Sequence, residues 1–340
     1  MKSAHYLLTI IFLLIFSLDT TAQDFSKIQY YYQVDSLVTE YSNNKQFEEA
    51  INVLKSAETK FPFYQIRIIN NLAQLYVTID QIEKAVDVYE DGQSKGLFFD
   101  LRPASGTYLR LLKNERFIKF INEDRKRFIE AQKNAKMEYN VVMPLNYNKN
   151  KKYPVFISMH GLSGNALTLE RFWKLDKYRD KVILVFLQSS QLVGMNSYGW
   201  GYIQRSREDL KKAYESLKEN YNIDESMVIV GGMSQGGEIA IDAVLNNVIP
   251  IAGFIAMNPA GGMMEGLNLD NVKNAASRNI SGSIITGEND YSFARQKLIA
   301  ELFEKGGIRS QFIVIPKICH QFPANVAERL DSALNFIFEK

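Results

Sequence analysis

Residues 227–237 read Met-Val-Ile-Val-Gly-Gly-Met-Ser-Gln-Gly-Gly, an apolar run that breaks into glycines around one serine. The apolar half predicts a buried strand, and residues 238–245 predict a helix. A tight turn between them would put Ser234 in strained backbone geometry and hold its hydroxyl clear of the sheet. Gly232 and Gly236 suit the turn because a Cβ at either position would collide with the neighbouring strand or helix. The stretch therefore predicts a nucleophile at Ser234, in preference to an ordinary glycine-rich turn.

Short apolar runs alternate with amphipathic stretches throughout residues 137–340. The predicted strands cover residues 141–143, 155–159, 182–186, 228–230, 254–257, 283–286 and 312–315. The predicted helices cover residues 206–220, 235–246, 293–305 and 326–339. This alternation predicts an α/β domain, with a mainly parallel sheet flanked by helices on both faces. Sites in such sheets lie at the carboxyl ends of the strands, where Ser234 lies.

Residues 24–136 have a helical pattern with almost no strand signal, which predicts a separate all-α domain of helical hairpins. Residues 47–51 and 82–86 resemble each other at a spacing of 35, and residues 117–118 lie another 35 further on. This period is similar to that of the tetratricopeptide repeat, although the copies are few and degenerate. Such a domain could form a peptide-binding groove, or it could pack on the second domain and shape the access to its site. The small number of copies favours the second interpretation.

Residues 1–22 have the features of a signal peptide: Lys2, an apolar stretch over residues 6–18, and small residues before a cleavage site near Ala22 or Gln23. We therefore expect export to the periplasm or the medium, with no membrane span after cleavage. The chain has 46% apolar residues and a net charge of +2, and it has no basic run that would indicate nucleic-acid binding. The single cysteine, Cys319, predicts a small buried residue and no internal disulfide.

A serine hydroxyl needs an adjacent base to act as a nucleophile at neutral pH. Only two histidines follow the predicted signal, and His320 lies in the loop after the last predicted strand. We expect His320 to be the base and His160 to hold a glycine loop together. Asp290 follows the strand at residues 283–286 and is the expected orienting acid, with Glu288 as the alternative. Asp242, on the predicted helix after the serine, is expected to be solvated.

Acyl transfer also needs backbone amides that stabilise the developing oxyanion. We expect one amide from Gln235, at the start of the helix after the serine. The second is expected from Leu162, in the glycine loop after His160. Trp200 lies in an aromatic cluster with Tyr198 and Tyr202, and we expect it to contact substrate; the alternative is packing between the domains.

Five motifs in this order resemble those of the α/β-hydrolase superfamily, in particular its phospholipase/carboxylesterase-type serine esterases. They are residues 160–165 (His-Gly-Leu-Ser-Gly-Asn), 188–191 (Gln-Ser-Ser-Gln), 232–237 (Gly-Met-Ser-Gln-Gly-Gly), 287–290 (Gly-Glu-Asn-Asp) and 320–323 (His-Gln-Phe-Pro). The resemblance covers residues 137–340 and implies ester hydrolysis through an acyl-serine, with Ser234, Asp290 and His320 as the triad. Residues 193–202 and 262–266 do not match the family pattern, which leaves the substrate pocket undefined.

Two alternatives remain open from the sequence. A serine peptidase on the same fold would use the same triad. A partner-binding protein with an inactive hydrolase domain would use the helical half. The expected ligand is a small-molecule ester, with a protein partner for the helical domain as a further option. We expect no metal and no cofactor, since two histidines and one cysteine make a poor zinc site and no glycine-rich phosphate loop follows a strand.

Overall fold

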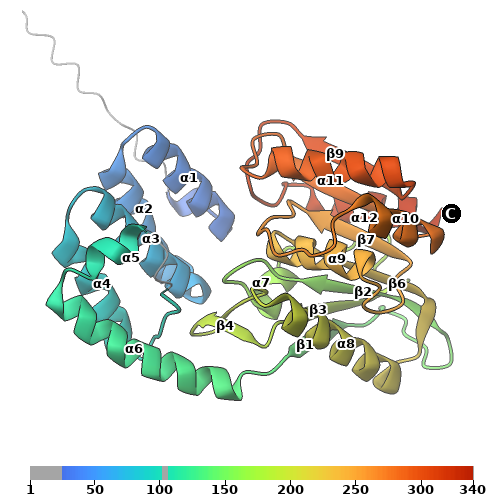
Figure 1. Ribbon diagram of the computed structural model, residues 1–340, viewed down its shortest axis with the longest axis horizontal. Coiled ribbons are helices and arrows are strands. Elements are labelled where there is room, and N and C mark those ends of the chain that lie inside the picture. Colours follow the sequence, from blue (N-terminus) through green and yellow to red (C-terminus); the bar gives the residue numbers. More distant parts are fainter. Residues whose placement is uncertain (1–24, 102–105, 340) are drawn as a thin grey trace, which may run out of the picture.

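The computed structural model describes residues 25–101 and 106–339. The predicted signal peptide at residues 1–22 lies outside the described residues. Figure 1 shows a helical region and a larger α/β region that lie beside each other, joined through the end of helix α6. In the part of the chain that the structure describes, no helix combines the length and apolar character that a membrane span needs.

The helical region consists of paired helices (Figure 1). It contains α1 (Tyr31–Asn43), α2 (Phe47–Lys60), α3 (Gln65–Thr78), α4 (Ile82–Ser94), α5 (Gly106–Leu111) and α6 (Glu115–Asn134), with short 3₁₀ turns at Phe25–Lys27 and Pro62–Tyr64. Helix α1 packs on α2, and α3 packs on α4. The two similar segments begin α2 and α4, and their small residues Ala50 and Ala85 are completely buried. The prediction of an all-α region of paired helices is confirmed, whereas membership of the tetratricopeptide family stays a prediction.

The α/β region contains one mostly parallel seven-stranded sheet, as the sequence predicts. Its strands are β1 (Glu138–Val142), β2 (Tyr153–Met159), β3 (Ile183–Gln188), β6 (Ile223–Met233), β7 (Gly253–Met257), β8 (Ser281–Gly287) and β9 (Arg309–Ile315). Their order is β1-β3-β2-β6-β7-β8-β9, and β1 alone pairs antiparallel to its neighbour. Strand β6, which leads to Ser234, therefore lies in the middle of the sheet.

Helices cover both faces of this sheet, because side chains that alternate along each strand point to opposite sides. On one face, Val155 and Ile157 pack in a core with residues of α8 (Ile203–Asn220), α9 (Gln235–Leu245), α10 (Leu269–Ser277) and α11 (Phe293–Gly306). On the other face, Phe156 packs with residues of α7 (Ala166–Glu170) and α12 (Val326–Phe338). The sequence patterns predicted α8, α9, α11 and α12, but not the shorter α7 and α10.

The segment after β3 forms a hairpin of β4 (Gln191–Gly194) and β5 (Ser197–Gly199), which the sequence did not predict. This hairpin contacts the helical region. Asp100 N donates to Val193 O at 3.2 Å, and Met195 N donates to Phe98 O at 3.0 Å. The side chain of Gln132, near the end of α6, adds two hydrogen bonds of 2.9 Å to the backbone of residues 190 and 192. These hydrogen bonds, two between backbone groups and two between the Gln132 side chain and the backbone, attach the two regions to each other.

Candidate active site

Ser234 lies at the sharp turn between β6 and α9, with φ 57° and ψ −120°. This positive φ is unusual for a residue with a side chain, and such strain persists only where the surroundings enforce it. A Cβ on Gly236 would lie 2.1 Å from Met159 O, and one on Gly232 would lie 2.4 Å from the same oxygen. The two glycines therefore let helix α9 approach strand β2 closely, which keeps the turn at Ser234 tight.

The Ser234, His320 and Asp290 side chains form a continuous hydrogen-bonded chain. His320 Nε2 lies 2.8 Å from Ser234 Oγ, and His320 Nδ1 lies 2.7 Å from Asp290 Oδ2. The Asp290 side chain is completely buried, and the His320 side chain is 18% exposed. The other carboxylate oxygen of Asp290 accepts a hydrogen bond of 2.7 Å from Ser292 N. With Nδ1–H donating to the carboxylate, His320 presents Nε2 to the hydroxyl as a proton acceptor.

The order of the strands explains why these residues meet. Strands β8 and β9 are neighbours, so the turn after Gly287 and the loop after Ile315 leave the same edge of the sheet together. The buried residue Asn258, which follows β7, links them: its Oδ1 accepts from Gly287 N at 3.0 Å and its Nδ2 donates to Gln321 O at 2.8 Å. No sequence pattern points to Asn258, because its role depends on contacts with two distant loops.

The two amides expected at the oxyanion site lie next to Ser234 and its loop. Gln235 N is at the first residue of α9. Gly161 precedes Leu162, and a Cβ on Gly161 would lie 3.3 Å from Ser234 Cβ. Neither Gln235 N nor Leu162 N donates a hydrogen bond within the described part of the chain. Two unused backbone donors at this position can bind a developing oxyanion.

His160 lies below the glycine loop and holds it in place. It is buried, its Nδ1 lies 2.8 Å from Gly161 O, and its Nε2 accepts from Ser189 N at 3.2 Å. These contacts require a neutral ring with its proton on Nδ1, and burial lowers the pKa of His160 to about 4. They agree with the loop-holding role that we expected of this histidine.

The structure corrects the expectation for Trp200. Its side chain is completely buried, so it does not form an open wall against substrate. Trp200 Nε1 donates to His160 O at 2.9 Å, and Trp200 N donates to Gln235 Oε1 at 3.0 Å. A buried indole needs a partner for its N–H, and the carbonyl of His160 provides one. Trp200 thus supports the loop and the serine turn from within the core, while Tyr202 is 74% exposed on the surface.

The structure also shows the surroundings of Glu288, Asp242 and Cys319. Those of Asp242 and Cys319 differ from the expectation. The alternative acid Glu288 does not contact His320; its Oε2 accepts from Lys317 N at 3.0 Å. Asp242, expected to be solvated, is buried and forms hydrogen bonds of 2.7 Å with Arg207 Nε and Nη2. Cys319, expected to be buried, is exposed because the loop after β9 runs along the surface.

Two features beside the triad, the Tyr291 ring and helix α1, were not predicted from the sequence. The Tyr291 ring lies 4.6 Å from the His320 ring between centroids, and Tyr291 is 74% exposed. The position of Tyr291 directly after Asp290 could have indicated that its ring lies near the histidine. Helix α1 of the helical region is the second element: Ser36 Oγ donates to Gln321 Oε1 at 2.5 Å, next to His320. No sequence pattern could indicate this contact, since the two residues lie 285 positions apart.

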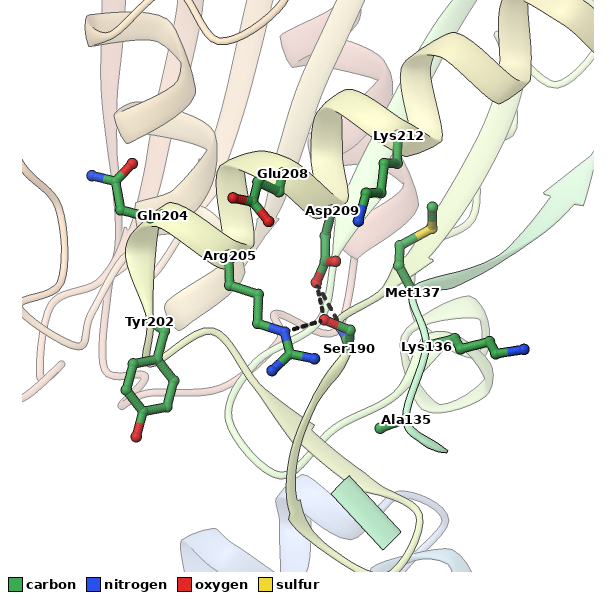
Figure 2. Close-up of a pocket in the computed structure, with 10 residues that line it drawn as sticks. All are labelled: Ala135, Lys136, Met137, Ser190, Tyr202, Gln204, Arg205, Glu208, Asp209 and Lys212. Carbon is green, nitrogen blue, oxygen red and sulfur yellow. Dashed lines mark hydrogen bonds between the residues drawn. The ribbon is translucent and has the colours of Figure 1, made fainter. Parts of the chain in front are cut away.

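A hollow of about 840 Å³ lies away from the triad, between the link after α6 and the start of α8. Figure 2 shows Arg205 and Asp209 pointing toward Ser190 within it. Ser190 N and Oγ donate to Asp209 Oδ2 at 2.8 and 2.9 Å, and Arg205 Nε donates to Ser190 Oγ at 2.9 Å. These polar groups satisfy one another and hold the turn before the β4–β5 hairpin, so we assign them a structural role.

No family model matches the chain. Over 140 residues it is 26% identical to an acyl-protein thioesterase 1 of Debaryomyces hansenii, a match that covers 39% of this chain and 56% of that protein. The chain thus spans little more than half the length of the curated relative that it matches.

Among solved structures, a ferulic acid esterase is similar with a TM-score of 0.51 at 16% identity, covering 62% of this chain and 95% of that one. An uncharacterized protein from Bacillus cereus is similar over 91% of this chain and 99% of that one, with 25% identity and a TM-score of 0.49. Together with the sheet topology, the similarity to this structure shows that the larger region has the α/β-hydrolase fold.

Proposed function

We propose that this protein is a serine hydrolase that cleaves carboxylic esters through an acyl-serine intermediate. Ser234 is the nucleophile, His320 the general base and acid, and Asp290 the residue that orients the imidazole. The observation that supports this best is the unbroken chain of hydrogen bonds, 2.7 Å from Asp290 to His320 and 2.8 Å from His320 to Ser234. A nucleophile, its base and an orienting acid in such contact are the arrangement that acyl transfer requires.

In the acylation step, Ser234 Oγ attacks the ester carbonyl while His320 Nε2 takes the hydroxyl proton. The tetrahedral oxyanion is bound by Gln235 N and Leu162 N. Gln235 N also lies at the positive end of the dipole of helix α9. When the C–O bond breaks, His320 returns the proton to the leaving alcohol, and the acyl group stays on Ser234.

In the deacylation step, His320 Nε2 takes a proton from water, and the resulting nucleophile attacks the acyl carbonyl. When the second tetrahedral intermediate collapses, the bond between the acyl carbon and Ser234 Oγ breaks and His320 returns the proton to Ser234 Oγ. The acid is released and the Ser234 hydroxyl is restored. In both steps the imidazolium that forms faces the buried carboxylate of Asp290. That carboxylate stabilises the positive charge at the moment it develops.

The test is the Ser234→Ala variant, assayed with a short 4-nitrophenyl ester. We expect turnover to fall by on the order of 10⁴ or more with unchanged folding, because the covalent step is lost. Ser226→Ala, at an exposed serine of β6, is the matched control. A fluorophosphonate probe should label wild type at Ser234, as read by mass. Near wild-type hydrolysis by Ser234→Ala would contradict the assignment.

The same assays separate the alternatives. A peptidase would prefer aminoacyl anilides to 4-nitrophenyl esters, and an inactive partner-binding protein would not react with the probe. The substrate panel should include an acyl thioester and a feruloyl ester, since the similar proteins are named as a thioesterase and a ferulic acid esterase.

We further propose that the protein is exported after cleavage near Ala22, on the strength of the residue pattern in residues 1–22. Amino-terminal sequencing of the protein recovered outside the cytoplasm tests this: a start at Ala22, Gln23 or an adjacent residue is expected. The uncleaved chain in the cytoplasm would refute it. The helical region, in this proposal, shapes access to the esterase site, and a groove for a protein partner is the alternative.

A further inference from the structure

The helical region borders the histidine loop of the α/β region. Besides the hydrogen bond from Ser36 to Gln321, the rings of Tyr30, at the N-cap of α1, and of Tyr32, within α1, pack on Phe172 with ring centroids 5.4 and 6.0 Å apart. Phe172 in turn stacks on Phe322, two residues after His320, at 4.8 Å. Residues near the start of α1 therefore lie beside the proposed catalytic histidine.

The boundary between the helical region and the histidine loop, which we call the seam, contains a guanidinium from each region. Arg67 of α3 pairs with Asp35 of α1 at 3.0 Å between Nη2 and Oδ2, and its side chain remains 42% exposed. Arg171 follows α7 in the α/β region, and its guanidinium lies 4.4 Å from the centroid of the Phe63 ring. Phe63 directly precedes Tyr64, whose ring stacks on that of Tyr31 at 4.2 Å, and the Arg67 guanidinium lies 5.7 Å from the centroid of the Tyr31 ring.

These charged groups lie close to the triad. Asp35, the partner of Arg67, directly precedes Ser36, which bonds to Gln321, and Arg171 directly precedes Phe172, which stacks on Phe322. The other nearby carboxylates have partners of their own: Asp290 bonds to His320, and Glu238 pairs with Arg295 at 3.0 Å. A group bound between the two arginines would thus lie beside the loop that carries His320.

The charges at the seam do not balance. Arg67 and Arg171 contribute two positive charges, and Asp35 contributes one negative charge. Within the described residues Arg171 has no carboxylate partner, and the carboxylate paired with Arg67 is that of Asp35. The planar guanidinium suits a carboxylate, with which it can form two parallel hydrogen bonds.

We propose that Arg67 and Arg171 form a binding subsite for a carboxylate group of the substrate, beside the ester that Ser234 attacks. The inference rests on the proposed esterase function and adds the substrate class: esters that carry one negative charge in their acyl or their alcohol part. The single surplus positive charge at the seam matches a monoanion. The helical region then supplies a specificity-determining residue, Arg67, to the site of the other region.

The experiment compares matched esters in two arms. For the acyl part, 4-nitrophenyl hydrogen glutarate is compared with its neutral methyl ester, and nitrophenol release is followed. For the alcohol part, 3-butyryloxybenzoate is compared with 3-butyryloxybenzamide. We expect wild type to prefer the anionic ester about tenfold or more in kcat/KM in one arm, since hydrogen bonds to charged groups have that effect. The arm with the preference identifies which part carries the charge.

The variants are Arg67→Met, Arg67→Lys, Arg171→Met and the control Arg179→Met, at an exposed arginine without a role in the seam. Both methionine substitutions at the seam should bring the ratio of anionic to neutral kcat/KM toward one, and Arg67→Lys should retain part of it. Arg179→Met should leave the ratio unchanged. Titration with the fluorophosphonate probe gives the folded, active fraction of each variant.

A wild-type ratio near one in both arms would overturn the subsite, as would ratios that neither Arg67→Met nor Arg171→Met changes. The esterase function would stand in both cases, provided that hydrolysis of the neutral esters depends on Ser234. If wild type hydrolysed no ester and the probe did not label Ser234, the esterase function would fail, and the subsite would fail with it.

Discussion

Replacing Asp290 with Asn tests the orienting role of the buried carboxylate. The carboxylate has two partners, Ser292 N at 2.7 Å and His320 Nδ1 at 2.7 Å. In the variant the amide oxygen can accept from Ser292 N, and the amide NH₂ then faces His320 Nδ1. Such a donor favours the imidazole tautomer with its proton on Nε2, which cannot accept the proton of Ser234.

The magnitude follows from the lost charge. When His320 becomes an imidazolium, its charge lies about 4 Å from that of Asp290, which corresponds to about 4 kcal/mol at an effective dielectric constant of about 20. A loss of about 4 kcal/mol in the transition state lowers the rate by about 10³-fold. The change of tautomer adds to this loss. We therefore expect kcat for Asp290→Asn to fall by about 10³-fold or more, with little change in KM.

The assay is the hydrolysis of a short 4-nitrophenyl ester, with the rate of fluorophosphonate labelling as a second readout that does not depend on product release. Glu288→Gln is the matched control, because it also neutralises a carboxylate two residues away that bonds to Lys317 N and not to His320. Its kcat should stay within a few-fold of wild type. If Asp290→Asn kept kcat within tenfold of wild type, or if Glu288→Gln lost more activity, the assignment of the acid would be refuted.

Three other changes have defined outcomes. Gly236→Ala should lower the free energy of unfolding by about 3 kcal/mol, because its Cβ would lie 2.1 Å from Met159 O; denaturant unfolding measures this, and an unchanged midpoint beside the control Gly106→Ala would contradict it. His160 has a folded pKa lowered to about 4, so its contribution to stability is present above about pH 6.5 and is lost as the pH falls toward 4. Wild type should lose about 3 kcal/mol more than His160→Gln over that interval, and parallel pH curves for the two proteins would count against the buried neutral ring. Ser36→Ala should lower the rate of probe labelling and kcat/KM about fivefold, since the hydrogen bond to Gln321 is worth about 1 kcal/mol. The control is Ser56→Ala. Equal labelling rates in wild type and both variants would show that α1 does not position the histidine loop.

Local chemistry in the chain was sufficient for much of the fold and of the candidate site. The strand, glycines and helix around Ser234 specify a strained turn through contacts between near neighbours. All seven strands of the main sheet are predicted by apolar runs, because the burial of a strand depends on the apolar side chains of that strand itself. The order Ser234, Asp290, His320 also follows from the sequence, since each residue lies in the turn or loop that follows a predicted strand.

The tertiary structure decided the features that depend on distant partners. The burial of Trp200 depends on the carbonyl of His160, and that of Asp242 depends on Arg207, so composition and spacing could not reveal either. The exposure of Cys319 depends on the course of a surface loop. The approach of Ser36 to Gln321 joins residues 285 positions apart. Apolar periodicity determines which side of an element is buried, but only the packing of complete elements determines which side chains meet there.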